Sequence, residues 1–452
     1  MRILLSSAFL LLIQFHAVQP AKAYSVLTHE AIIDRSWKPE ILPLLLARFP
    51  DATEEQLREA RAHAYGGAIL QDMGYYPFGS KFFSDLLHYT RSGDFVVSMI
   101  RDSKDLNEYA FALGALAHYA ADNLGHPVAI NRAVPLMYPK LRAKYGDLVT
   151  YEDDPVSHLR TEFSFDVISI AQGQYAPEAY HDFIGFKVSK ELVDRAFQDT
   201  YSLSLKDLFR DLDLALGTYR FTVAQVIPEL TKTAWHSKKE EIQKLQAGMT
   251  RRKFVYRLSR SKYQKEWDGK FEEPGGGARF LACLLHIIPK VGPFKALAFK
   301  VPTPEAEKLF VASFKDTMER YRVLLGEVKD KQLRLDNQNF DTGRPTRKGE
   351  YKKADETYEK LVEHLGDAPN NISIDLRTNI LAFYREASPT SEKARAVLEV
   401  LRKQQIPRSN TQLTPYHADK RKDVYARNAR EDFQVRLSPA ITPSTRDIVV
   451  KN

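Results

Sequence analysis

Two short segments of this sequence place histidine and carboxylate side chains at helical spacing. His118, Asp122 and His126 follow one another at intervals of four, and His158 and Glu162 repeat that interval 32 residues after His126. On an α-helix, residues four apart project from one face, with Cβ atoms about 5–6 Å apart. Imidazole and carboxylate groups placed in this way suit zinc, which binds N and O ligands at about 2.0–2.2 Å. The pattern therefore predicts helices that carry a metal site, and with it a type of reaction.

Bulk composition sets wide limits on the partners of the chain. It has 452 residues, 44% of them hydrophobic and 27% charged, with a formal net charge of +8 and a pI near 9.1. These values indicate a mostly globular protein. They permit an anionic partner such as a membrane surface, a nucleic acid or a phosphoester, but they select none of them and also fit an ordinary basic surface. The single cysteine, Cys283, excludes an internal disulfide, so any metal must be held by His, Asp, Glu and backbone groups.

The first 23 residues have the pattern of a secretory signal peptide. Arg2 precedes a mostly apolar run over residues 3–13, and Ala21, Lys22 and Ala23 fit a small-residue cleavage site. The run is shorter than the roughly 20 residues that span a bilayer comfortably, although an N-terminal anchor helix remains the alternative. We expect a secreted or periplasmic protein whose mature chain starts at Tyr24.

The rest of the chain predicts an all-α fold, because alternating strand patterns are scarce. Residues 24–245 are predicted to form one helical domain, in which Thr53 and Ser103 are candidate N-caps, Pro127 ends or kinks a helix, and Pro155 starts one. Three further segments follow. We expect a linker with an apolar and helical extension over 246–350, a helical hairpin over 351–404 and a poorly ordered tail over 405–452.

The first third of the chain is rich in histidine. Any one of these residues alone is more often a surface or hydrogen-bonded core residue than a ligand, and an i, i+4 pair is often a simple ion pair. We interpret His63 as a packing residue or one that supports a ligand. The combination of five candidate ligands within 45 residues is what favours a metal site; they are His118, Asp122, His126, His158 and Glu162. The six histidines between residues 29 and 158 are His29, His63, His88, His118, His126 and His158.

These residues resemble the zinc-dependent phospholipase C superfamily, which is related in fold to the single-strand-specific S1/P1-type nucleases. The resemblance covers about residues 24–165. It implies a multi-helix bundle that encloses three zinc ions, here with additional C-terminal helices. It also implies a hydrolase for phosphoric diesters that works through metal-activated water.

The resemblance assigns a role to each candidate ligand. The mature N-terminus, Tyr24, would bind one zinc through its amine and carbonyl together with His29, and Asp122 would bridge that ion and a second one. The second ion would take the carboxylate of Asp72, which is also the proposed proton acceptor. The remaining family positions correspond to His88 and His118 at the second ion, and to His126, His158 and Glu162 at the third.

Two departures from the family pattern bear on the substrate. Tyr24 replaces the usual tryptophan, which backbone ligation should tolerate. The interval from Asp122 to His126 is shorter than in the secreted phosphatidylcholine enzymes and the nucleases, and is similar to the glycosylphosphatidylinositol-phospholipase D branch. The final His-x3-Glu pair, His158 and Glu162, is typical of the phospholipases, because the nucleases have aspartate there.

Three hypotheses for function follow. The leading one is phospholipid hydrolysis in phospholipase C fashion, giving diacylglycerol and a phosphorylated head group, with peripheral contact to a membrane surface. The second is a nuclease for single strands, for which stacking aromatics such as Tyr75, Tyr76 or Phe78 would have to lie near the metals. The third is a binding protein in which zinc only holds helices together. Sequence leaves the head group and the oligomeric state open.

Overall fold

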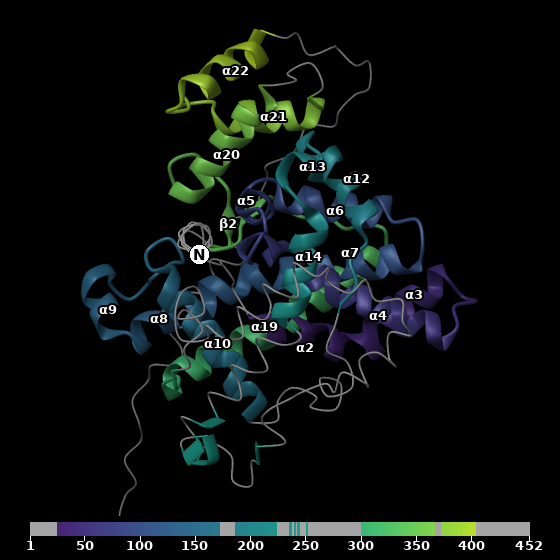
Figure 1. Ribbon diagram of the computed structural model, residues 1–452, viewed down its shortest axis with the longest axis vertical. Helices are drawn as coiled ribbons and strands as arrows, with labels where there is room; N and C mark the ends of the chain where they lie inside the picture. The colour runs from purple at the N-terminus through teal and green to yellow at the C-terminus, as the bar shows by residue number, and fades with distance from the viewer. Residues whose placement is uncertain are drawn as a thin grey trace, which may run out of the picture. The chain divides into compact units, whose positions relative to one another are not determined.

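A computed structural model describes residues 25–171, 186–223, 300–366 and 372–403, together with a few short pieces between 235 and 251 (Figure 1). The predicted signal peptide, Tyr24, Cys283 and the predicted tail lie outside the described residues. Within them the regular secondary structure is helical apart from one short antiparallel pair, β1 (Gln338–Asn339) and β2 (Arg344–Pro345). The all-α prediction is confirmed.

The first helices run in close succession along the chain. They are α2 (Val26–Ser36), α3 (Leu42–Arg48), α4 (Glu54–Ile69), α5 (Lys81–Tyr89), α6 (Ser92–Asp102), α7 (Leu106–Leu124), α8 (Asn131–Met137), α9 (Pro139–Tyr145) and α10 (Pro155–Ala171). Three irregular turns join some of them: the π-helices η2 (Trp37–Ile41) and η4 (Gly125–Ile130), and the 3₁₀-helix η3 (Leu70–Tyr75).

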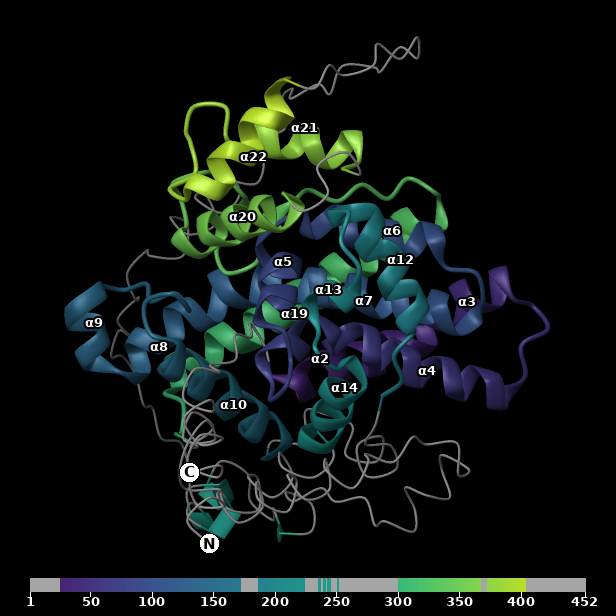
Figure 2. The same ribbon diagram turned by 45° about the horizontal axis from the view of Figure 1, so that its top comes forward.

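The later helices divide into two sets. The first contains α12 (Lys190–Tyr201), α13 (Leu205–Leu208) and α14 (Leu212–Phe221). The second contains α19 (Pro304–Lys329), α20 (Lys352–Leu365), α21 (Ile374–Phe383) and α22 (Glu392–Lys403). α20, α21 and α22, drawn in green to yellow, group together in both views (Figure 2).

Helix boundaries follow the capping chemistry of the sequence. Thr53 forms the expected cap with a reciprocal bond to Gln56, and Pro155 begins α10 as predicted. The prediction of Ser103 as the cap of α7 is wrong. Ser103 ends α6, and the carboxylate of Asp105 accepts a hydrogen bond from the Glu108 amide at 2.8 Å. An aspartate that lies directly before the helix competes with serine on equal terms at this position.

The centre of the fold is α7, which packs against α4, α6 and α19. Small residues let α4 and α7 approach until backbone touches backbone. A Cβ added to Gly67 would lie 1.9 Å from the Phe111 carbonyl oxygen, and one added to Gly114 would lie 2.0 Å from the Ala64 carbonyl oxygen. Close helix packing therefore explains Gly114, whose position before His118 sets how near α4 comes to the site.

We expect Gly114→Ala to destabilise the protein although alanine is the better helix former. The added methyl group has no flexible neighbour to displace, so the helices must separate, at a cost of about 1–3 kcal/mol. Gly326→Ala in α19 is the matched control. Nothing lies within 4 Å of its added Cβ, so it should stabilise the chain by roughly 0.5–1 kcal/mol. Denaturant unfolding measures both; equal stability of the two variants would contradict this packing.

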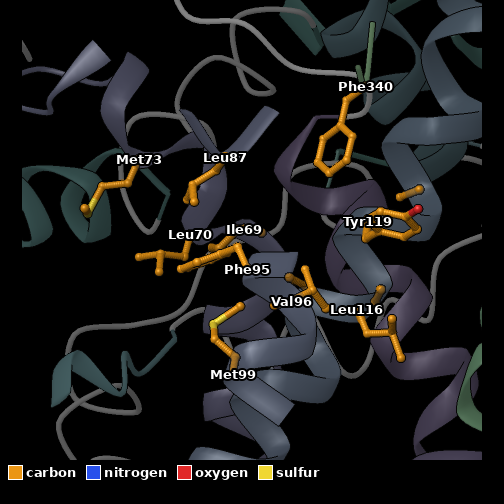
Figure 3. Packing of buried hydrophobic residues seen from close by; sticks show 14 of the residues in the cluster. Ile69, Leu70, Met73, Leu87, Phe95, Val96, Met99, Leu116, Tyr119 and Phe340 are labelled. Atoms are coloured by element: carbon orange, nitrogen blue, oxygen red, sulfur yellow. The ribbon is translucent and has the colours of Figure 1, made fainter. Parts of the chain in front are cut away.

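The hydrophobic core around α7 includes a residue from far along the chain. Figure 3 shows Ile69, Leu70 and Met73 beside Leu87, the α6 side chains Phe95, Val96 and Met99, and the α7 side chains Leu116 and Tyr119. Phe340, more than 200 residues after Tyr119, completes this cluster with its ring centroid 5.6 Å from that of Tyr119. Burial of such a ring contributes about 1.5–3 kcal/mol.

The C-terminal helices also pack against this core. α19 contacts α7, η4 and α8, and α20 contacts α5. The polar composition of residues 328–350 predicts a linker, but the structure folds part of it into β1 and β2 and buries Phe340 and Asp341 completely. Polar side chains in this segment bond to α5, α6 and α7, and no periodicity reveals such partners. None of the described helices is both long enough and apolar enough to cross a bilayer.

Candidate metal centre

Six elements bring the candidate ligands to one buried place. His29 comes from α2, Asp72 from η3 and His88 from α5, while the pair His158 and Glu162 comes from α10. α7 and η4 supply the central series; its members are His118, Asp122 and His126. All these side chains are at most 1% exposed. The structure thus gathers every predicted ligand except Tyr24, which lies outside the described residues.

Asp122 lies at the middle of this group. Its Oδ1 is 3.5 Å from Nε2 of His29, and its Oδ2 is 3.2 Å from Nε2 of His118 and 3.5 Å from Nε2 of His88. Nε2 of His126 lies 4.0 Å from the same Oδ2. The two carboxylate oxygens therefore face different imidazoles. A single carboxylate in this position can bind two cations, one through each oxygen.

Backbone carbonyls fix the tautomers of two histidines. The Nδ1–H of His88 donates to the Ser84 carbonyl at 2.8 Å, and the Nδ1–H of His118 donates to the Ala68 carbonyl at 2.9 Å. When either ring is neutral, it therefore presents an unprotonated Nε2 toward Asp122, as a metal ligand must. The close approach of α4 and α7 brings the Ala68 carbonyl within reach of His118.

His158 is oriented by an amide side chain. Asn131 donates from Nδ2 to the Asp341 carbonyl at 2.7 Å, so its Oδ1 faces Nε2 of His158 at 2.8 Å. Nε2 of His158 is consequently the protonated nitrogen, and Nδ1 faces Oε1 of Glu162 at 2.8 Å. The His126 ring stacks on that of His158 with centroids 5.1 Å apart. These contacts make a second ligand group beside the one around Asp122.

The start of α2 is tied to α10 by a buried carboxylate. Asp166 accepts hydrogen bonds from the backbone amides of Leu27 and Thr28, both at 3.2 Å, and from the Thr28 hydroxyl. A carboxylate at a helix N-terminus satisfies amides that have no partner within the helix. It holds residue 25, and with it the chain just before His29, at the side of the metal centre.

The charge states of the metal-free cluster follow from burial and neighbours. Burial alone would raise the pKa of Asp122, but the imidazoles of His118, His88 and His29 outweigh it and hold the pKa of this carboxyl well below its ordinary value. For His126, burial lowers the pKa to about 3. Burial also opposes charging of His88, yet the carboxylates of Asp122 and Asp72 raise its pKa to about 10.

Donor chemistry and geometry fit zinc. The ligand atoms form three sets, and within each set they lie within 4.8 Å of one another. The sets are His29, His118 and Asp122, then Asp72, His88 and His118, then His126, His158 and Glu162. Among the described residues, both oxygens of Asp72 and Asp122 and the Nε2 atoms of His88 and His118 have no hydrogen-bond partner. Buried acceptor atoms that converge without a donor are costly unless a cation lies between them.

We expect zinc loading near neutral pH to release a proton from His88. Its pKa of about 10 makes the metal-free imidazole cationic, whereas a ligand must be neutral. Calorimetric titration of metal-free protein in buffers of different ionisation enthalpy measures the release. His88→Gln should release one proton fewer, and a binding heat that does not depend on the buffer would contradict this assignment.

The same raised pKa sets the pH dependence of the metal-free fold. The imidazolium of His88 stabilises that fold fully below its ordinary pKa of 6.5, and this contribution is lost as pH rises through about 10. Denaturant unfolding with chelator present should therefore show stability falling across this window. His88→Gln should remove that fall.

Sequence reasoning missed two residues that contact the cluster. Asn131 follows His126 on the same helical run and gives no signal by itself, because an asparagine there fits any exposed turn. Asp341 comes from β1–β2, far beyond the candidate ligands, and its Oδ1 lies 3.3 Å from Nε2 of His126. His63, interpreted as a packing residue, contacts Ser189 at 2.9 Å and belongs to none of the three ligand sets.

Comparison with known proteins agrees with this geometry. Residues 28–211 match the family described as zinc dependent phospholipase C. This range is less than half of the 452 residues, and it contains all the described ligands predicted from the sequence. No curated protein and no solved structure matches the chain. Residues 28–211 therefore form a domain of the zinc-dependent phospholipase C superfamily.

Proposed function

We propose that the chain is a zinc-dependent phosphodiesterase that hydrolyses phospholipids to diacylglycerol and a phosphorylated head group. The family domain supports phosphodiester hydrolysis of the phospholipase C type. The observation that carries the finer proposal is the position of Asp122, whose two buried oxygens face separate imidazoles. We assign one zinc ion to His29 and Asp122, a second to Asp72, His88 and His118, and a third to His126, His158 and Glu162, with Asp122 as a ligand that the first two ions share.

Bound zinc would polarise the phosphodiester and lower the pKa of a water toward about 7, which supplies hydroxide at neutral pH. The protein side chains then hold the ions in place and accept a proton. Asp122 would fix the separation of the ion held with His29 from the ion held by Asp72, His88 and His118. Asp72 is the proposed proton acceptor for the attacking water, because its carboxylate is buried beside His88 at 3.5 Å and has no hydrogen-bond donor among the described residues.

The His158 and Glu162 pair favours a lipid over a nucleic acid substrate, because the phospholipases that the sequence resembles have glutamate at this position and the nucleases have aspartate. The aromatic side chains offer a second indication. Tyr75 and Tyr76 are buried, and Tyr75 packs edge-on against His88 with ring centroids 5.5 Å apart. They are therefore engaged in packing and do not offer open faces for bases. Of the three candidate stacking residues, Phe78 alone is exposed, at 39%.

Export completes the proposal. The catalytic domain would span residues 24–245 of a secreted or periplasmic protein, with the amine of Tyr24 freed by cleavage after Ala23. The burial of Ser25 and the bonds from α2 to Asp166 support a chain start close to the centre. Intact mass of the exported protein tests this: it should lack residues 1–23, and a retained leader would contradict it.

A paired assay tests the substrate. Zinc-loaded protein is given lecithin micelles or single-stranded DNA in water enriched in ¹⁸O. Phospholipase C chemistry places the heavy oxygen in the phosphorylated head group and yields unlabelled diacylglycerol. Label in phosphatidic acid would indicate cleavage of the other P–O bond, and faster cleavage of DNA would overturn the lipid proposal. His118→Ala is the inactive control.

A further inference from the structure

The segment that joins α19 to α20 is fastened to the domain that holds the metal centre. Ser92 of α6 bonds to both the carbonyl and the amide of Gln338, at 2.7 and 3.0 Å. The Tyr119 hydroxyl donates to the Asp336 carbonyl at 2.9 Å, and the Phe340 amide donates to the His88 carbonyl at 3.1 Å. These bonds fix the backbone that leads into Asp341.

Phe340 covers the imidazoles of the centre. Its ring centroid lies 5.4 Å from that of His88 and 6.0 Å from that of His118. Figure 3 shows the ring above Tyr119, within the buried cluster. The next residue, Asp341, is thereby carried into the interior, where its side chain is completely buried.

The two carboxylate oxygens of Asp341 have different surroundings. Oδ2 accepts hydrogen bonds from the Tyr89 hydroxyl, at 2.9 Å, and from the Tyr351 hydroxyl. Oδ1 lies 3.3 Å from Nε2 of His126. Within the described part of the chain neither Oδ1 nor Nε2 of His126 has a hydrogen-bond partner. Two atoms that can each bind a metal ion thus face one another in the interior, while the other carboxylate oxygen is held by two hydroxyl groups.

This spacing is that of two ligands on one ion. Tetrahedral zinc with bonds of about 2.0–2.2 Å places its ligand atoms about 3.3–3.6 Å apart. The Asp341 backbone is also bonded to Asn131, the residue that orients His158. A buried carboxylate oxygen with neither a donor nor a cation beside it would be strongly unfavourable.

We propose that Asp341 is a metal ligand, which joins His126, His158 and Glu162 on one zinc ion. This inference rests on the proposed metal centre but goes beyond the family domain, which ends at residue 211. With Asp341 the ion has four protein ligands, the closed arrangement of a structural zinc site. The ion then ties the C-terminal region to the family domain, and another oxygen reaches it only by displacing Asp341.

Zinc binding by the full chain tests the proposal. Wild type, Asp341→Asn and Asp336→Asn are equilibrated with buffered free Zn²⁺, and bound metal is counted by elemental analysis. Asp336 is the matched control because it is an exposed carboxylate of the same segment. We expect Asp341→Asn to bind one ion at least about tenfold more weakly, since losing even a group that only orients a ligand costs about 10–100-fold. Asp336→Asn should bind like wild type.

Unfolding with and without chelator separates ligation from packing. If Asp341 is a ligand, Asp341→Asn lowers the increase in Tm that zinc produces; if it only packs, the loaded and metal-free Tm values shift equally. Tyr351→Phe, which removes one orienting hydroxyl, should weaken the same ion and serves if Asp341→Asn does not fold. Unchanged zinc affinity in these variants overturns the inference alone, whereas a wild type without zinc overturns the metal centre itself.

Discussion

Asp122→Asn is expected to abolish phosphodiesterase activity and to remove zinc. Asparagine has nearly the shape of aspartate but lacks the charge, and it offers one oxygen where Asp122 turns two oxygens to separate imidazoles. Loss of a single group that stabilises charge in a transition state costs about 10²–10³-fold in rate. Loss of a ligand shared by two ions should cost at least about 10³-fold, together with one or two equivalents of zinc.

The control for this variant is a carboxylate at the other end of the same helix. Asp105 caps the N-terminus of α7 and is exposed. Asp105→Asn should change stability by no more than about 1 kcal/mol and leave both zinc and activity in place. Steady-state kinetics and elemental analysis compare the two variants. Full zinc content and activity in Asp122→Asn would show that the carboxylate is not a bridge.

Removal of zinc by a chelator is expected to abolish activity and to lower Tm strongly. The cluster contains several completely buried carboxylates and imidazoles that converge, and in the absence of zinc the imidazolium of His88 balances only part of the carboxylate charge. An ion that binds only the folded chain stabilises it by about 4 kcal/mol when its free concentration is about a thousand times Kd. Several ions should therefore account for a large part of a typical folding free energy.

Calorimetry with and without metal measures this stabilisation. Return of Zn²⁺ should restore both Tm and activity. Mg²⁺ should restore neither, because it prefers octahedral oxygen ligands and the cluster is rich in imidazole. A chelated protein with the Tm of the loaded one would contradict a metal centre at the core of the fold.

The positions that could be predicted from sequence are those with local physical signals. Four-residue spacing on α7 and α10 places His118 with Asp122 and His158 with Glu162, whatever the tertiary structure does. Thr53 and Pro155 mark helix starts through local capping chemistry. The prediction of Ser103 as the N-cap of α7 is wrong because two candidate caps, Ser103 and Asp105, lie two residues apart. Only the observed hydrogen bond decides between them.

The features that could not be predicted depend on contacts between distant parts of the chain. The Ala68 carbonyl orients His118 only because Gly114 admits α4, and a backbone carbonyl leaves no trace in a sequence motif. Asn131 orients His158 only because its amide group also donates a hydrogen bond to the Asp341 carbonyl. Asp341 itself lies in a polar stretch that predicts a linker, because hydrogen bonds to Ser92 and Tyr89 replace the apolar periodicity that would have revealed a buried segment.

Anomalous diffraction at the zinc edge from crystals of the mature, zinc-loaded chain tests the central claim most directly. The account predicts zinc peaks on both sides of the Asp122 carboxylate and a further peak among His126, His158, Glu162 and Asp341. Absence of any peak beside Asp122, in crystals whose protein binds zinc in solution, would contradict it.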